Sequence, residues 1–423
     1  MFSSRDSIVT AIEFGTSKIG VLVGAVNENG DVEVIGRGEA PALSSVVKGE
    51  IVDMEKAFEQ FGKALEEADR SSGRVLGSSL LVAVAVTGCG IDSQPGIGTV
   101  FIKNDERIVT EAEQNEAHEN ARVLNLAADR EIISSSASYF LIDGRRVSNP
   151  LRHKGSRLEA HMHIIHGISS RIDNFRTMVR DAGFDDSAVE VVFSPVADDI
   201  GVLNDLDRSD GVLLIDLGAG CTEYIVEYDR GIITSGVLQI GMEHIANDLS
   251  VGLKLSMATC RKLLRSGDLA RAIAERRETL EFHTGSGTGA ARSIPLASFE
   301  TVVDLRLREL FGIIRSRLEK AGVPHSLAAG GVLTGGGSLF PRAQELFKET
   351  FDLSCRVAQP SDAGGAVTDL ESPCCSTLWG TLKIAAYYAG QGLGRKGGSL
   401  GRGRNLADNM ADLVKKLSRA LKF

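Results

Sequence analysis

The sequence feature that most constrains the fold is a three-strand pattern that occurs twice, about 200 residues apart. In the first copy, short turns separate three apolar segments, Ile8–Ile12, Ile19–Val26 and Val32–Gly36. The turns contain residue types that interrupt strands, with Gly15 in the first turn and Asn29-Gly30 in the second. Apolar runs bounded in this way predict strands that pair as antiparallel neighbours.

The second copy has the same order of strands and turns. Its predicted strands are Val212–Ile215, Tyr224–Tyr228 and Ile232–Leu238, with a glycine-bearing turn at 216–222 and another turn at Arg230-Gly231. Because the same order of segments builds the same small sheet, we infer an internal duplication. It would produce two similar α/β halves that face each other.

Further helices and strands are predicted around the two copies. Apolar residues at helical spacing in Glu55–Arg70 predict a helix, and the run Leu80–Val86 predicts a buried strand. Residues 78–167 form a separate region between the copies, which begins and ends with strand-like segments. Other helices are predicted at Glu111–Ala128, Glu243–Leu249, Cys260–Leu264, Phe299–Lys320 and Pro341–Phe351.

Composition excludes several classes of protein. The formal net charge is −9 and aromatic residues make up 5% of the chain, so no nucleic-acid partner is expected. The six cysteines contain no CxxC pair, and we interpret them as reduced thiols of a cytosolic protein. Residues 1–10 lack the apolar core of a secretory signal, and the longest apolar run is too short to span a bilayer.

Two other local patterns have simple interpretations. His161 and His163 share one face of a predicted strand and His166 follows, but no further ligand for a metal is evident. We interpret these histidines as a polar strand face. The glycine-rich run Gly285–Gly289 is interpreted as a loop, because no strand leads into it as a dinucleotide fingerprint requires.

Three glycine-bearing turns, at 13–18, 216–222 and 334–338, each follow an apolar strand. Consecutive N–H groups in such turns form a concave site for phosphate oxygens, although a single turn of this kind is usually only a turn. Glu13 and Asp216 end their strands at equivalent places, and two carboxylates facing across a cleft suit a hydrated Mg²⁺. The chain has no GxxxxGKS or GxxxxGKT motif, which excludes a P-loop site.

The motifs IEFGTSK, LIDLGAGCTE and GVLTGGGS resemble the phosphate 1, phosphate 2 and adenosine motifs of the actin, Hsp70 and sugar-kinase superfamily. Within it the chain most resembles the FtsA family of bacterial cell-division proteins, over nearly its whole length. The resemblance implies that ATP binds, with Mg²⁺ held through water by Glu13 and Asp216. The implied nucleotide site comprises Glu13, Gly15, Thr16, Ser17, Lys18, Asp216, Gly218, Ala219, Gly220, Cys221, Thr222, Gly335, Gly336, Gly337 and Ser338.

The implied fold is α/β, with duplicated ribonuclease-H-like halves of the actin type, an inserted subdomain and a C-terminal amphipathic helix. In the subdomain names of this family, the expected division is 1A at 1–77, the inserted 1C at 78–167, 1A again at 168–208, 2A at 209–241, 2B at 242–320, 2A again at 321–371, and a return to 1A at 372–389. A basic glycine-rich linker at 390–404 and a membrane-targeting helix at 405–423 follow.

The motifs depart from the superfamily pattern at three positions. Glu13 stands where Asp is common and is one methylene longer. Ala219 occupies a position that favours glycine and would crowd the phosphate site. Cys221 replaces a hydroxyl with a weaker hydrogen-bond donor.

The segment between the halves bears on ATP hydrolysis, which requires an oriented water. Relatives that hydrolyse ATP often have Glu or Gln there, whereas this chain has Ser194 before Pro195. Asp198 and Asp199 are the candidates for a catalytic role, and acids at a helix N-terminus are the alternative interpretation. We expect slow or negligible hydrolysis.

Residues 405–423 have an amphipathic helical pattern that follows a basic, glycine-rich linker. From Arg395 onward the chain has eight Lys or Arg and two Asp or Glu. The pattern predicts reversible binding to an anionic membrane surface, with docking on the protein's own domain as the alternative. Apolar residues within a wedge of about 100° are Leu406, Met410, Leu413, Val414, Leu417 and Leu421, and the basic residues outside it are Lys415, Lys416, Arg419 and Lys422.

The resemblance also implies partners. FtsA-like proteins form filaments on the cytoplasmic face of the cell membrane at the division site, tether FtsZ filaments there and help to recruit later septal division proteins. The acidic C-terminal tail of FtsZ would contact subdomain 2B, where the candidate residues are Arg292, Arg306 and Arg308. The alternatives within the superfamily are a pilus-assembly adaptor and a metabolite kinase, and neither gives a reason for the amphipathic helix.

Overall fold

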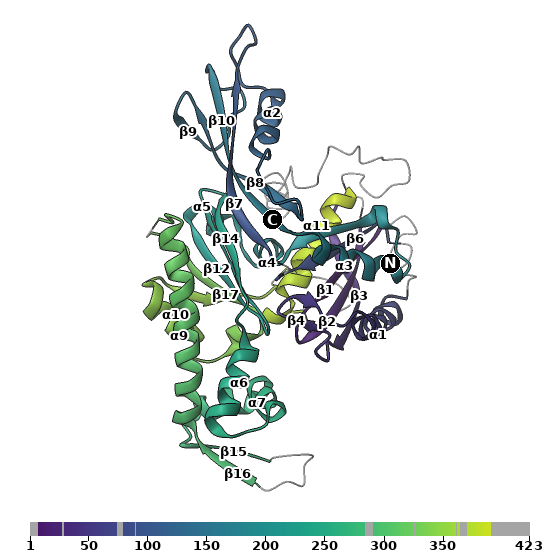
Figure 1. Ribbon diagram of the computed structural model, residues 1–423, viewed down its shortest axis with the longest axis vertical. Coiled ribbons are helices and arrows are strands. Elements are labelled where there is room, and N and C mark those ends of the chain that lie inside the picture. The colour runs from purple at the N-terminus through teal and green to yellow at the C-terminus, as the bar shows by residue number, and fades with distance from the viewer. Residues whose placement is uncertain are drawn as a thin grey trace.

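Figure 1 shows the computed structural model, in which two sheets lie side by side at the centre of an elongated molecule. The structure describes residues 7–27, 29–73, 79–88, 90–283, 291–324, 326–360, 362–363 and 370–390. The predicted amphipathic helix at 405–423, nearly all of the predicted linker before it, and the loop Gly285–Gly289 lie outside the described residues.

The first copy of the repeated pattern forms most of a five-stranded sheet. Its three strands pair as antiparallel neighbours, and two later strands join in parallel beside the first. Phe14, Phe61 and Phe175 pack together where helices α1 (Met54–Ser72) and α3 (Ser169–Asp181) cover this sheet. In spatial order the strands are β11 (Val189–Phe193), β6 (Leu81–Val86), β1 (Ser7–Phe14), β2 (Lys18–Val26) and β3 (Val32–Pro41).

The second copy forms an equivalent sheet. Its first three strands are again antiparallel neighbours, and two later strands are again parallel to the first. This identity of strand order and direction confirms the predicted duplication. In spatial order the strands are β14 (Gly231–Leu238), β13 (Thr222–Tyr228), β12 (Val212–Leu217), β17 (Gly330–Thr334) and β18 (Cys355–Val357).

The two sheets also match in register. Glu13 and Asp216 are each the last residue but one of the first strand in their half. The pairing of the second strand with the third shifts at the same distance from these acids, after Val23 in one half and after Val226 in the other. The duplication therefore extends to a local irregularity of the kind that bends a strand.

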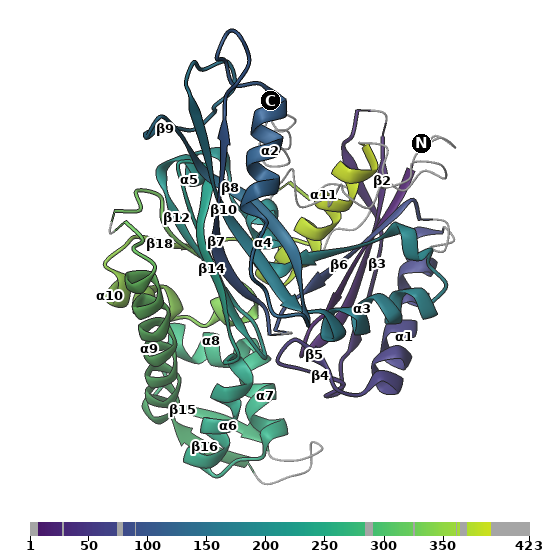
Figure 2. The same ribbon diagram turned by 45° about the horizontal axis from the view of Figure 1, so that its top comes forward.

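Two helices lie between the sheets and join the halves. Helices α4 (Ser194–Val202) and α11 (Ser376–Gly390) pack against each other, and Figure 2 shows α11 between the two sheets. Their buried apolar residues form one core with residues of β1 and β12, and Trp379 is the largest fully buried side chain. Short elements flank them, namely α5 (Asp205–Asp210) and the 3₁₀ turn η4 (Pro373–Cys375).

The insertion is a four-stranded antiparallel sheet with one helix, and it projects beyond β14 at one end of the molecule (Figure 1). Helix α2 (Glu111–Ala121) is shorter than the predicted helix, which was expected to reach Ala128, because residues 122–129 form the connection that returns the chain to its next strand. In spatial order the strands are β7 (Asp92–Phe101), β10 (Arg157–Ile168), β8 (Arg130–Ile142) and β9 (Arg145–Val147).

The histidines of β10 lie in three different environments. His163 is buried where the insertion meets β14, its Nε2 lies 2.8 Å from Ser235 Oγ, and burial lowers its pKa to about 4. His166 Nδ1 accepts a 2.8 Å hydrogen bond from Arg130 Nε, and the His161 ring stacks on a neighbouring tyrosine. The predicted polar face is therefore partly buried in an interface between the insertion and the second half.

At the opposite end of the molecule, helices and a hairpin form a smaller subdomain next to the second sheet (Figure 1). None of the helices described in the structure has the length and apolar character needed to cross a bilayer. The elements at this end are α6 (Met242–Leu253), α7 (Met257–Arg265), α8 (Gly267–Ala274), β15 (Thr279–His283), β16 (Ala291–Pro295) and the long helix α9 (Leu296–Lys320). Helix α10 (Ala343–Phe351) packs against α9 and β18 beside the second sheet. The remaining short elements are β4 (Val46–Val47), β5 (Glu50–Ile51) and the 3₁₀ turns η2 (Asp186–Ala188) and η3 (Gly336–Leu339).

Candidate functional site

The glycine-bearing loops of the two halves meet at one point. The first loop connects β1 to β2 and is closed by a hydrogen bond of 2.9 Å from Gly15 N to Lys18 O. The second loop connects β12 to β13. A methyl group added to Gly220 of this loop would lie 2.3 Å from the Thr16 hydroxyl oxygen and 3.0 Å from the Lys48 backbone nitrogen. The two predicted phosphate loops are therefore in contact across the boundary between the halves.

The third glycine-bearing loop lies beside the acidic end of β12. Gly335 has a φ of +76°, and a Cβ atom there would lie 1.8 Å from Asp216 Oδ1. Both the left-handed backbone and the close approach require glycine. Ser338 Oγ donates a 2.7 Å hydrogen bond to Gly335 O, which closes the loop. The structure thus brings all three sequence motifs to one place.

Four carboxylates gather beneath these loops. Asp198 and Glu223 are buried, whereas Glu13 and Asp216 are partly exposed at the ends of their strands. Thr377 Oγ1 of α11 donates a 2.8 Å hydrogen bond to Asp198 Oδ1. One oxygen each of Glu13, Asp198 and Asp216 has no hydrogen-bond partner among the described residues. The cluster therefore presents unsatisfied acceptors.

The pKa values of the four clustered carboxyl groups are all raised. Burial, and then the charge of Glu13, raises the pKa of Asp216 to about 7. Burial and the charge of Asp216 raise the pKa of Asp198 and that of Glu223 well above their usual range, and burial also raises the pKa of Glu13. Four neighbouring carboxylates cannot all ionise at low cost without a cation.

The chemistry of this cluster fits a magnesium ion that keeps its water ligands. Mg²⁺ prefers oxygen ligands and commonly binds through few carboxylates together with phosphates and water. No three His, Cys, Asp or Glu side chains in the described ranges are placed to hold a metal directly. The unpaired oxygens of Glu13 and Asp216 suit contacts to such an ion through water, and a magnesium site here stays a prediction.

Lys18, which the sequence places in the first phosphate loop, has a carboxylate partner. Its Nζ lies 3.1 Å from Glu39 Oε2 on β3, and its side chain is only 17% exposed. Burial lowers the pKa of Lys18, but the charges of Glu13 and Glu39 outweigh this and raise it. The ammonium group therefore stays charged, close to Glu13.

Asp198 and Asp199 are adjacent in sequence but lie in different environments. Asp198 lies near the carboxylates of Asp216 and Glu223, whereas Asp199 Oδ1 accepts a 3.0 Å hydrogen bond from Arg208 Nε. Arg208 is buried and also lies 3.7 Å from Glu227 Oε2. Helix α4 begins at Ser194, so neither acid lies in its first turn, and the alternative interpretation as N-terminal helix acids is wrong.

Two further groups of the cluster were missed from the sequence. Glu223 pairs directly with Asp216 across the β12–β13 hairpin, and its carboxylate accepts a hydrogen bond from the Thr87 hydroxyl. Counting residues through the hairpin could have placed Glu223 opposite Asp216. Thr377, on a helix far along the chain, carries no local signal, because its role depends on how α11 packs against α4.

The candidate residues for a protein partner lie on the smaller subdomain. Arg306 Nε donates a 2.7 Å hydrogen bond to Asp248, and Arg308 lies 2.5 Å from Glu349. Arg292 Nη1 donates a 3.2 Å hydrogen bond to the backbone oxygen of Lys254. All three guanidinium groups thus have partners within the protein.

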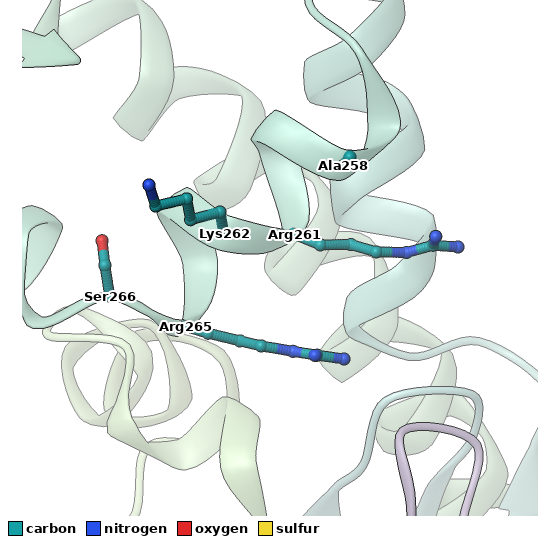
Figure 3. Close-up of a pocket in the computed structure, with 5 residues that line it drawn as sticks. All are labelled: Ala258, Arg261, Lys262, Arg265 and Ser266. Atoms are coloured by element: carbon teal, nitrogen blue, oxygen red, sulfur yellow. The ribbon is translucent and has the colours of Figure 1, made fainter. Parts of the chain in front are cut away.

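A basic hollow opens on helix α7 of the same subdomain (Figure 3). Arg261 and Arg265 extend from the helix side by side, and Lys262 points to its other side. Arg261 pairs with Glu243 at 2.7 Å, but no described carboxylate lies within ion-pair distance of Lys262 or Arg265. This hollow was not predicted from the sequence.

Comparisons with known proteins agree with this geometry. The family model described as cell division protein FtsA matches residues 213–380, and the model described as an SHS2 domain inserted in FtsA matches residues 88–166. Cell division protein FtsA of Borreliella burgdorferi is 29% identical over 378 residues, which cover 89% of this chain and 90% of that protein. The FtsA protein of Neisseria meningitidis is 27% identical over 384 residues, which cover 90% and 91% of the two chains.

Solved structures show the same fold. The PilM–PilN type IV pilus biogenesis complex contains a chain that superimposes with a TM-score of 0.62 and 15% identity, covering 89% of this chain and 98% of that one. MreB 5 of Spiroplasma citri bound to AMPPNP gives a TM-score of 0.51 and 13% identity, covering 89% and 95%. The predicted α/β fold of the actin type, duplicated and with an inserted domain, is confirmed. The chain is similar to the FtsA family of bacterial cell-division proteins over about nine-tenths of its length.

Proposed function

We propose that the protein binds Mg²⁺ and ATP between its two halves, assembles into filaments, and holds FtsZ filaments at the cytoplasmic face of the cell membrane at the division site. It would also help to recruit later septal division proteins. The observation that carries this proposal is the contact between Thr16 and Gly220, which brings two copies of one phosphate loop face to face. A solved structure of the same fold, MreB 5 of Spiroplasma citri, is described as bound to AMPPNP.

The residues of the site have distinct parts in nucleotide binding. Backbone N–H groups of the first and second loops would donate to phosphate oxygens, since successive amides in such turns form an anion site. Thr222 Oγ1 is buried without a described partner and is available to the same phosphates. Residues 335–338 would lie against the adenosine. Bound Mg²⁺ would neutralise phosphate charge, and Glu13 and Asp216 would orient its water ligands.

Hydrolysis of ATP should be slow or negligible. Ser194 stands where an acid or amide often occurs in ATP-hydrolysing relatives, and its hydroxyl donates a 3.1 Å hydrogen bond to Val86 O. Asp198 is the carboxylate that remains available to orient water in the cleft. ATP would then act mainly as a ligand that favours filament assembly. Phosphate release from the purified protein faster than about one turnover per second, the low end for typical enzymes, would contradict this part of the proposal.

The basic amphipathic segment at 405–423 would attach the filaments to anionic lipid. One such helix binds a membrane weakly and reversibly. A filament that presents many copies binds far more tightly without new contacts, because each attached copy raises the effective concentration of its neighbours at the membrane. Assembly and membrane attachment would therefore be coupled. The pilus-assembly and kinase alternatives do not account for this segment.

The acidic tail of FtsZ would bind the smaller subdomain, where Arg292, Arg306 and Arg308 remain our candidates. Because Arg306 and Arg308 already pair with carboxylates, the tail would have to replace those partners. Peptide binding can be measured by fluorescence anisotropy with a labelled FtsZ tail and an Arg308→Glu variant. The control is Arg145→Glu, which adds the same charge on the distant strand β9. Equal affinities for the two variants would remove Arg308 from the site.

Electron microscopy on anionic lipid monolayers tests the whole proposal. With ATP, the full chain should form filaments on the monolayer, and a variant lacking residues 405–423 should leave it bare. Zwitterionic monolayers serve as the control for the charge of the surface. Filaments on the monolayer without residues 405–423 would refute the role of this segment in attachment.

A further inference from the structure

Lys48 lies at the tip of a small hairpin that reaches from the first half to the second. Strands β4 and β5 pair through Val46 with Ile51 and Val47 with Glu50, which leaves Lys48 and Gly49 as a two-residue turn. The tip lies against the loop after β6, since a methyl group added to Gly88 of that loop would lie 2.1 Å from Lys48 O.

The backbone of this turn is unusual for a lysine. Lys48 has a φ of +51° and Gly49 a φ of +75°, so both residues adopt the left-handed conformation. Two-residue turns with two positive φ values strongly favour Asn-Gly or Asp-Gly, because a long L side chain is strained in the first position. Strain of this kind is often retained where a side chain is needed for function.

The surroundings of Lys48 indicate what that function is. Its backbone nitrogen lies at the junction of the two phosphate loops, next to Gly220 and Thr16. No carboxylate in the described part of the chain pairs with its ammonium group. Burial lowers the pKa of His244 at the start of α6, and the charges of Lys48 and Arg306 lower it further. The lysine charge is therefore close to the second half.

The position of the adenosine loop indicates which phosphate of a bound nucleotide would lie nearest to Lys48. Gly335 of that loop approaches Asp216, on the side of β12 away from β13, whereas Gly220 lies between β12 and β13. A nucleotide whose base end lies at the adenosine loop extends its phosphates toward Gly220 and Lys48. The last phosphate of the chain would come closest to the lysine.

We propose that Lys48 contacts the terminal phosphate of bound ATP across the boundary between the halves and thereby distinguishes ATP from ADP. This inference rests on the proposed nucleotide site. An ammonium ion paired with a phosphate forms a charge-assisted hydrogen bond, which is among the stronger kinds in proteins. ADP lacks the phosphate that would make this contact, so the lysine should contribute little to its binding.

The test measures ATP and ADP affinities of the full chain by isothermal titration calorimetry, for the wild type and three variants. Lys48→Asn removes the charge but suits the turn, so the nucleotide-free protein should unfold at the same or a higher urea concentration. We expect its ATP affinity to fall about tenfold or more and its ADP affinity to change less than threefold. Lys48→Arg should retain part of the preference for ATP. Lys103→Asn, an exposed lysine of the insertion, is the control and should leave both affinities unchanged.

The outcomes separate this inference from the function on which it rests. A wild type that binds neither nucleotide overturns both. A wild type that binds nucleotide, with the same ratio of ATP to ADP affinity as Lys48→Asn, overturns the role of Lys48 and leaves the nucleotide site intact. An equal loss of ATP affinity in Lys48→Asn and Lys103→Asn also overturns it, because the effect would then reflect overall charge.

Discussion

Glu13 and Asp216 occupy the same position in two copies of one strand pattern, and burial, followed by the charge of Glu13, raises the pKa of Asp216. Each acid lies directly before a glycine-bearing loop, and these loops touch through Thr16 and Gly220. The duplication therefore produces a site that neither half could form alone. Its negative charge and its concave backbone loops suit a cation bound together with phosphates.

The adenosine loop depends on the absence of a side chain at Gly335. Gly335→Ala would place a methyl group against Asp216 Oδ1 and force alanine into a left-handed backbone. We expect a loss of more than about 1 kcal/mol of unfolding free energy from the backbone alone, together with loss of ATP binding. Gly62→Ala in helix α1 is the control, because its new methyl group meets no atom within 4 Å and the residue lies outside the nucleotide site. Normal ATP binding by Gly335→Ala would show that this loop does not contact the nucleotide.

The adjacent acids Asp198 and Asp199 should respond differently to the same substitution. Asp199→Asn removes the charge paired with the buried guanidinium of Arg208, and we expect a loss of about 3 kcal/mol of unfolding free energy. Burial and the charge of Asp216 disfavour the ionised form of Asp198, and Asp198→Asn keeps an oxygen for Thr377, so stability near pH 7 should not fall. Urea unfolding of both variants provides the comparison.

The variants Asp198→Asn and Asp199→Asn also distinguish a role in ATP hydrolysis from a role in stability. Any slow phosphate release from ATP should decrease in Asp198→Asn and stay near the wild-type rate in Asp199→Asn, when rates are expressed per folded molecule. Identical rates in the two variants would exclude Asp198 from the reaction.

The buried His163 makes stability depend on pH. Its pKa is lowered from an ordinary value near 6.5 to about 4, so the unfolded chain binds its proton more readily than the folded protein does. The unfolding free energy should therefore fall as the pH falls from about 7 to 4, by up to about 3 kcal/mol from this residue. His163→Gln can keep a contact with Ser235 and does not titrate, so unfolding at pH 5 and pH 7 should differ less than in the wild type. An unchanged pH dependence would assign the effect to other groups.

The amphipathic segment permits a matched pair of charge insertions. Leu417→Glu places a carboxylate within the apolar wedge, whereas Ser418→Glu adds the same charge outside it. Cosedimentation with anionic vesicles should fall strongly for Leu417→Glu and more strongly when Leu413→Glu is added. Ser418→Glu should retain most of the binding. If both single variants lose binding equally, only net charge matters and the helical wedge plays no part.

The parts of the site predicted from the sequence are those encoded over short distances. The strand–turn–strand pattern places Glu13, Asp216 and the glycine loops, because a strand end and its turn are local features. Asp198 and Asp199 could not be separated in this way, since the packing of α4 decides which one faces the cleft. Lys48 was missed for the same reason: its hairpin is short, and its relation to Gly220 exists only in the folded protein.

The surface of the smaller subdomain shows another limit of sequence patterns. Arg306 and Arg308 fit an exposed basic face of a helix, but besides Glu309 of the same helix their carboxylate partners come from α6 and α10. The spacing of charges along one helix cannot show which acids other helices bring near. The sequence also could not predict that Lys262 and Arg265 of α7 have no carboxylate partner among the described residues. They differ from the paired arginines only in the side chains that other elements place near them.

The most direct test of the account is the dependence of ATP binding on Mg²⁺, measured by calorimetry for the wild type and for a Glu13→Gln, Asp216→Asn double variant. The wild type should bind ATP at least tenfold more tightly with Mg²⁺ than with EDTA. The double variant should lose that difference, because the carboxylates that orient the hydrated ion are gone. An ATP affinity of the wild type that is the same with Mg²⁺ and with EDTA, or no ATP binding at all, would contradict the account.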